Sequence, residues 1–179
     1  VCWGRGRAGE LGTQNHPVLA ALTVPLTEEA VQVVTNTDTD NSSDDYLGFS
    51  CSLHPGSEVH CWGSNVAVGL FGAIDRRGAF GRVPYLDAAG GFTSVTELTA
   101  GAHHVCALVN GGQVICWGSD DNGRADGRTD GGSSSFCSPG TTTGQNRCTP
   151  LTDESDVLIS DAEQIDAGHQ VSCAVRTSG

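Results

Sequence analysis

Short β-prone segments separated by glycine-rich turns dominate the hydrophobic pattern of this chain. Val105-Cys106-Ala107-Leu108 and Val114-Ile115-Cys116-Trp117 flank the turn Asn110-Gly111-Gly112-Gln113, an arrangement that predicts a β-hairpin. No window shows a convincing helical stripe, because the best one, residues 19–34, is interrupted by Pro25 and is rich in threonine and valine. The pattern therefore predicts an all-β fold of short strands.

The pattern recurs along the chain in three units. Cys-Trp-Gly stands at residues 2–4, 61–63 and 116–118, and each copy is followed by a glycine-rich stretch and then by a proline. Alternating segments at 95–108 and 162–175 end the later units, and a damaged version stands at 49–53. The units cover approximately residues 1–58, 59–113 and 114–179 of one domain. Because four short strands cannot bury both faces alone, we expect a partial β-propeller of four-stranded antiparallel blades.

The cysteine spacing predicts disulfides. Cys51 and Cys61 lie symmetrically about Gly56, and so do Cys106 and Cys116 about Gly111, which places each pair directly opposite in its hairpin. A third pair, Cys137 and Cys148, pins an insertion at residues 130–147. No pair has the Cys-x-x-Cys spacing of a zinc site. Disulfides in turn imply an extracellular, cell-surface or periplasmic location.

Two cysteines remain, and they stand near the two ends. Aligned on the hairpins, both ends of the sequence fall at one hairpin, where Cys173 and Cys2 take the two disulfide positions. We expect these two to be unpaired or intermolecular. Either the sequence is part of a longer chain, which is the interpretation we favour, or copies associate and complete the hairpin. The opening Val1-Cys2-Trp3-Gly4 lacks a charged and apolar leader, as expected for a mature product or a fragment.

The charge balance excludes some function classes. The chain has no lysine, nine arginines against 21 acids, and a formal net charge of −12. Nucleic-acid binding needs a positive face that displaces counterions, so we exclude it. No apolar run approaches the roughly 18 to 20 residues that span a bilayer.

Candidate chemistry is confined to acidic segments. Asp38, Asp40, Asp44 and Asp45 alternate oxygen-bearing side chains as calcium loops do, although the segment lacks the central glycine and final glutamate of an EF-hand. A solvated acidic loop is the simpler interpretation, so calcium remains an open alternative. Asn41-Ser42-Ser43 is a glycosylation sequon.

A second acidic segment covers residues 153–166, with six acids and no base, and predicts a solvated face and possible docking surface. Six histidines invite a metal or catalytic assignment, but His103 and His104 are adjacent and point to opposite faces of a strand. No nucleophile, base and orienting group recur at recognisable spacing, so no catalytic residue is assigned.

The ordered motifs Gly9-Glu10-Leu11-Gly12, Gly63-Ser64-Asn65 and Ala100-Gly101-Ala102-His103-His104-Val105-Cys106-Ala107-Leu108 resemble the repeats of the regulator of chromosome condensation family. That family forms seven-bladed propellers, and the Cys-Trp-Gly form with a paired upstream cysteine is similar to its secreted bacterial branch. This sequence departs from the family pattern at Phe49 and Val171, which replace the histidine that His104 retains.

The resemblance implies a binding role. Members of this family act in nucleotide exchange on a small GTPase, in chromatin docking and in inhibition of a secreted hydrolase. With its acidic charge and its cysteines, this chain is expected to be a non-enzymatic secreted or cell-surface scaffold that binds a protein. The alternatives are a structural subunit of an extracellular assembly, in which copies or missing blades complete the terminal hairpin, and a calcium-dependent adhesion module.

Overall fold

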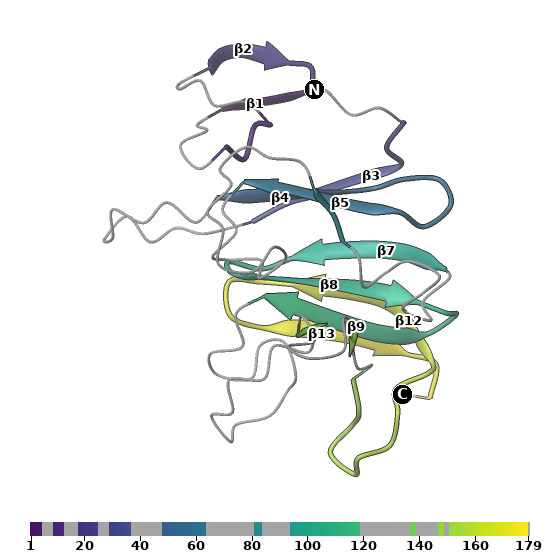
Figure 1. The fold of residues 1–179 in the computed structure, drawn as a ribbon. Coiled ribbons are helices and arrows are strands. Elements are labelled where there is room, and N and C mark those ends of the chain that lie inside the picture. The colour runs from purple at the N-terminus through teal and green to yellow at the C-terminus, as the bar shows by residue number, and fades with distance from the viewer. Residues whose placement is uncertain are drawn as a thin grey trace.

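In a computed structural model the chain forms a row of short antiparallel sheets (Figure 1). The structure describes residues 1–4, 9–12, 18–24, 29–36, 48–63, 81–83, 94–118, 137–138, 147–148 and 151–178, and within them it contains strands and turns but no helix. This confirms the all-β prediction. The strands are β1 (Cys2–Gly4), β2 (Val18–Leu22), β3 (Gln32–Thr35), β4 (Phe49–Leu53), β5 (Val59–Gly63), β6 (Gly81–Arg82), β7 (Val95–Ala100), β8 (His104–Val109), β9 (Gln113–Gly118), β10 (Cys137–Ser138), β11 (Arg147–Cys148), β12 (Ala162–Ala167) and β13 (Ser172–Arg176).

The first complete blade is the four-stranded sheet β3-β4-β5-β6. Its central hairpin places Cys51 opposite Cys61 and Phe49 opposite Gly63. Gly63 has φ +107°, and a Cβ there would lie 2.5 Å from the Gly48 carbonyl oxygen, so only glycine fits where this strand ends. The positive φ and the close approach of the Gly48 backbone therefore explain why the Cys-Trp-Gly motif ends in glycine.

The second blade repeats this construction in the sheet β7-β8-β9. Cys106 lies opposite Cys116, as the mirrored spacing predicts. At the outer edge the amide of Leu151 donates to the carbonyl of Val114 at 2.8 Å, and in the first blade Val83 donates to Val59 at the same distance. Leu151 therefore holds the same position in the second blade that Val83, directly after β6, holds in the first blade.

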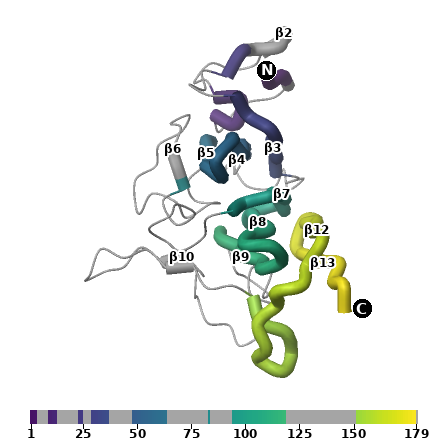
Figure 2. The backbone as a smooth tube through the Cα atoms, turned by 90° about the vertical axis from the view of Figure 1, so that its right-hand side faces the viewer, coloured from purple at the N-terminus to yellow at the C-terminus, as the bar shows by residue number. Residues whose placement is uncertain are grey.

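Two half-blades flank the complete ones. The N-terminal half-blade is the pair β1-β2, and the C-terminal half-blade is the pair β12-β13. β1 carries Cys-Trp-Gly and is thus equivalent to β5 and β9, whereas β13 carries Cys173 and is equivalent to β4 and β8. The two half-blades lie toward opposite ends of the row in both views (Figures 1 and 2).

The blades are joined by a hydrogen bond that repeats. Val34, Thr99 and Asp166 lie opposite Cys51, Cys106 and Cys173 in their sheets. In each of these three strands the residue two positions earlier has an amide or carboxylate side chain, namely Gln32, Glu97 and Gln164. The Gln32 amide accepts from the Leu98 amide at 2.8 Å and donates to the Leu98 carbonyl at 2.9 Å. Glu97 likewise accepts from the Ile165 amide at 3.3 Å.

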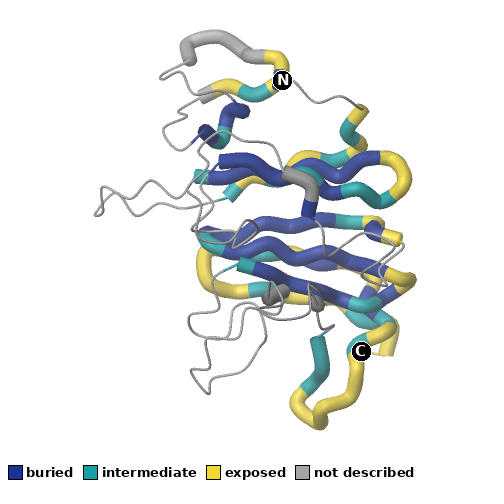
Figure 3. The backbone as a smooth tube through the Cα atoms, in the orientation of Figure 1, coloured by how far each residue is buried: buried dark blue, intermediate teal, exposed yellow. Residues whose placement is uncertain are grey.

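The hydrophobic core lies between the sheets and is concentrated at the two complete blades. One buried cluster joins the first two blades and includes Phe49, Val59, Leu98, Ile115 and Trp117. A second cluster joins the second blade to β12 through Cys106, Leu108, Val114, Cys116, Ala162 and Ile165. Burial falls away toward both half-blades and along the segment after β11 (Figure 3).

The sheets and the sequence repeats divide the same pattern at different points. The sheets run out of phase with the units 1–58, 59–113 and 114–179, because the hairpins β4-β5 and β8-β9 cross both internal boundaries. The motif that defined the units is the third strand of a blade, so the same repeat is divided at another point. In the hairpin β4-β5, His54 is only 2% exposed, and its Nε2 lies 2.8 Å from the Ser52 hydroxyl.

Candidate functional site

The second acidic segment forms a short, ordered hairpin, which we call the acidic loop (residues 153–161). At its base Thr152 and Leu158 form a β-bridge, and the Ile159 amide donates to the Leu151 carbonyl at 3.0 Å. Leu151 and Ile159 pack on the second core cluster, so the loop is anchored to the blade below it.

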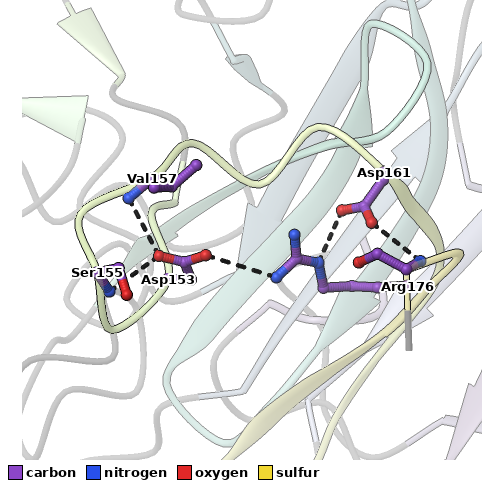
Figure 4. Close-up of polar contacts among 6 residues, drawn as sticks. Asp153, Ser155, Val157, Asp161 and Arg176 are labelled. Carbon is purple, nitrogen blue, oxygen red and sulfur yellow. Dashed lines mark hydrogen bonds and ion pairs between the residues drawn. The ribbon is translucent and has the colours of Figure 1, made fainter.

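Asp153 organises the turn of the acidic loop. Its Oδ1 accepts hydrogen bonds from the amides of Ser155 at 2.9 Å and Val157 at 3.1 Å (Figure 4). Its own amide donates to the Val157 carbonyl at 2.8 Å. Asp156 adopts a left-handed backbone conformation with φ 58°, which aspartate tolerates better than most residues. The aspartates therefore shape this turn besides charging it.

Arg176 at the end of β13 connects the acidic loop to the C-terminal half-blade. Its Nε donates to Asp161 Oδ1 at 2.7 Å, and its Nη1 lies 3.7 Å from Asp153 Oδ2 (Figure 4). The Ser178 amide donates to the second oxygen of Asp161 at 3.2 Å. Hydrogen bonds from Ser178 and Arg176 hold the pKa of Asp161 below its ordinary value of 3.8. One arginine thus fixes both ends of the loop.

The outer surface of the acidic loop combines apolar and acidic side chains. Val157 is 57% exposed and Leu158 is 40% exposed, and the exposed Glu154 and Asp156 stand beside them in the chain. The sequence indicated the acids of residues 153–166 as a possible docking surface. It missed the exposed apolar pair and the role of Arg176, which lies outside the acidic segment.

The structure brings together the cysteines of the two complete blades. Cys51–Cys61 and Cys106–Cys116 are disulfides, with Cα atoms 4.1 Å and 4.0 Å apart. In the short pair β10-β11 the backbones of Cys137 and Cys148 lie opposite each other, and their side chains are outside the described part of the chain.

The two terminal cysteines stay apart. Cys2 and Cys173 are free, and they belong to the two half-blades at opposite ends of the row.

The residues of the calcium and glycosylation predictions are not among those that the structure describes. Asp38, Asp40, Asp44, Asp45 and Asn41 all lie outside the described residues, so the calcium and glycosylation predictions stay predictions. Among the described residues no group of three or more His, Cys, Asp or Glu side chains is arranged to hold a metal ion.

Two histidines of neighbouring blades lie near each other. His103 and His169 approach each other across the blade junction, with ring centroids 6.5 Å apart.

In the described part of the chain no helix is long and apolar enough to cross a membrane.

A family model gives the first comparison with known proteins. Residues 95–124, which cover β7, β8 and β9, match the regulator of chromosome condensation (RCC1) repeat. No curated protein matches the sequence of the chain.

Solved structures match over nearly the whole chain. Human WBSCR16 is similar with a TM-score of 0.65 and 16% identity, covering 98% of this chain and 39% of its own. Yeast RCC1 (Prp20), solved bound to Kap60, gives 0.65 and 18% identity, covering 99% and 37%. Prp20p from Saccharomyces cerevisiae, described with its binding properties to Gsp1p and histones, gives 0.63 and 19% identity, covering 99% and 39%.

This chain thus spans well under half the length of the solved structures that it resembles. The fold similarity extends across both complete blades and both half-blades, while the matched repeat covers the second blade alone. Together, the solved structures show that the chain has a β-propeller fold like that of yeast RCC1, and within it residues 95–124 match the regulator of chromosome condensation (RCC1) repeat.

Proposed function

We propose that this chain is a non-enzymatic scaffold that binds a protein partner through its acidic loop. The observation that carries the proposal is the pair Val157 and Leu158, which stand exposed on a braced turn beside Glu154 and Asp156. Apolar side chains held outward on an ordered loop lose little conformational entropy on binding. The partner that fits is a protein segment with basic side chains beside apolar ones.

The charge of the chain supports a protein partner over a nucleic acid. With a net charge of −12 and no lysine, the chain repels phosphate and attracts basic protein surfaces. Protein binding is also what the similar proteins display, since yeast RCC1 was solved bound to Kap60 and Prp20p has binding properties to Gsp1p and histones.

The disulfides support a location outside the cytosol. Cys51–Cys61 and Cys106–Cys116 close the central hairpins of both complete blades, and such bonds persist in oxidising compartments. We therefore place the scaffold in the extracellular space, at the cell surface or in a bacterial periplasm, as a secreted member of its fold.

The test is binding to short synthetic peptides that carry arginine beside leucine or phenylalanine, with peptides carrying glutamate in place of arginine as the negative set. Leu158→Ser is expected to weaken binding of the basic peptides at least about tenfold, the size of a modest interface hot spot. Val31→Ser is the matched control, because Val31 is 63% exposed and lies outside the acidic loop. Equal loss in both variants, or equal binding of both peptide sets, would refute the proposal.

A further inference from the structure

The turn between β8 and β9 presents an asparagine that is followed by a glycine. Asn110 and Gly111 are both exposed at the tip of the hairpin. Asn110 has φ 47° and Gly111 has φ 73°, and such left-handed conformations are typical of asparagine–glycine hairpin turns. One backbone bond crosses the turn, from the Gly112 amide to the Val109 carbonyl at 3.2 Å. The Asn110 side-chain amide donates to Oε1 of Gln113 at 3.4 Å, which is a solvent-exposed contact within the same turn.

The backbone nitrogen of Gly111 is accessible to a reacting group. In the described part of the chain its amide donates no hydrogen bond, and a Cβ built at Gly111 would meet nothing within 4 Å. Glycine also has no side chain of its own beside that nitrogen. When the exposed turn opens, the Gly111 nitrogen can therefore reach the side-chain carbonyl carbon of Asn110.

A second asparagine lies in the opposite surroundings and serves as an internal comparison. Asn36 is half-buried, and both ends of its side-chain amide are hydrogen bonded. Its Nδ2 donates to the Ala102 carbonyl at 3.2 Å, and its Oδ1 accepts from the Phe49 amide at 3.2 Å. Thr37 follows it, and a β-branched side chain crowds the adjacent backbone nitrogen. Exposure, neighbouring residue and accessible nitrogen therefore all single out Asn110.

We propose that Asn110 is a deamidation site, at which the Gly111 nitrogen attacks the side-chain carbonyl carbon and closes a succinimide ring. The new nitrogen–carbon bond replaces the bond to Nδ2, which leaves as ammonia and takes the proton of the Gly111 amide. Water then opens the ring at either carbonyl and gives aspartate or isoaspartate. One water is consumed and one ammonia is released, and nothing is oxidised or reduced.

The modification changes the charge of the surface beside the acidic loop. The Gly112 carbonyl accepts from the Ala162 amide at 3.0 Å, so the turn lies against the residue that follows the loop. Either product replaces a neutral amide with a carboxylate, and isoaspartate also lengthens the backbone of the turn. The chain thus acquires a more negative form with time. The modification itself does not depend on the proposed function.

The experiment incubates the folded 179-residue chain in mildly alkaline buffer at body temperature and maps its peptides by mass spectrometry. Chymotrypsin cleaves after Trp117 and so separates Asn110 from Asn122-Gly123, a second such pair that lies outside the described residues. We expect Asn110 to convert at least about tenfold faster than Asn36, because glycine leaves the attacking nitrogen unhindered. Isoaspartate and aspartate should both form. Equal conversion of the two asparagines, or aspartate as the only product, would overturn the proposal.

A matched pair of glycine variants tests the attacking nitrogen itself. Gly111→Ala adds a methyl group beside that nitrogen and is expected to slow the conversion of Asn110 at least about fivefold. The Cys106–Cys116 disulfide keeps the two strands of this hairpin joined in the variant. Gly56→Ala is the control, because Gly56 has φ +84° in the hairpin turn of the first blade and its Cβ would also meet nothing within 4 Å. It carries a similar backbone strain but should leave the conversion of Asn110 unchanged, and equal rates in the two variants would refute the mechanism.

Discussion

The strands β8 and β13 carry nearly the same pattern in opposite circumstances. β8 contains Cys106-Ala107-Leu108 and β13 contains Cys173-Ala174-Val175. The first three residues are at most 6% exposed, while Val175 is 56% exposed. β8 has a strand on each side, but β13 has only β12 among the described strands. The comparison shows that a neighbouring strand on each side decides whether a strand of this fold is buried. The alternation of apolar and polar residues along the strand does not show whether both neighbours are present.

The largest difference between complete and half-blades should appear at the equivalent tryptophans. Trp117→Ala is expected to reduce the free energy of unfolding by about 3–5 kcal/mol, because it empties a buried site in the first core cluster. Trp3→Ala should change it by less than about 0.5 kcal/mol, since Trp3 is 71% exposed. Chemical denaturation of both variants as monomers checks this, and similar losses would contradict the comparison.

The cysteines should divide in the same way. Replacing both Cys106 and Cys116 by serine is expected to cost about 2–3 kcal/mol, because the unfolded chain regains the freedom that the hairpin disulfide removes. Replacing Cys2 and Cys173 together should leave the monomer's unfolding midpoint unchanged, since both are free. Thermal melting at low protein concentration measures both. A destabilised terminal double variant would show that these thiols already support the folded monomer.

Equivalent glycines give a smaller contrast. A Cβ on Gly101 would lie 2.5 Å from the Gly168 carbonyl and would also meet the buried His104 ring. Gly101→Ala is therefore expected to cost about 1–3 kcal/mol through overpacking. The same change at Gly168 meets only a Val171 methyl at 3.3 Å, which can move at an exposed position. Denaturation midpoints compare the two, and equal costs would indicate that the half-blade is as closely packed as the complete one.

The smallest effect concerns pH and the acidic loop. Because the pKa of Asp161 is lowered in the folded state, its stabilising contribution is present above the ordinary value of 3.8 and is lost as the pH falls through the lowered pKa. The Ser178 amide, which donates to Asp161, should therefore lose protection in strongly acid solution, as followed by NMR. Asp161→Asn should remove this transition, whereas Glu154→Gln, at an exposed position, should retain it.

Local symmetry allowed the sequence to predict much of the fold. The mirrored spacing about Gly111 placed Cys106 opposite Cys116, because a hairpin register follows from its turn. The inter-blade bonds of Gln32 and Glu97 could not be predicted, since their partners lie 66 and 68 residues away and only the stacking of blades brings them together. For the same reason the acids of the loop were visible in the sequence, but Arg176 was not recognised as their partner.

Residue-resolved hydrogen exchange tests the central claim most directly, namely that strand pairing and burial in residues 1–179 are concentrated in the two complete blades and fall away in the half-blades. In the dilute monomer the amides of β8 should exchange slowly and those of β13 should exchange much faster on average, because only one side of β13 is paired. Equal protection of β8 and β13 in the monomer would contradict the account.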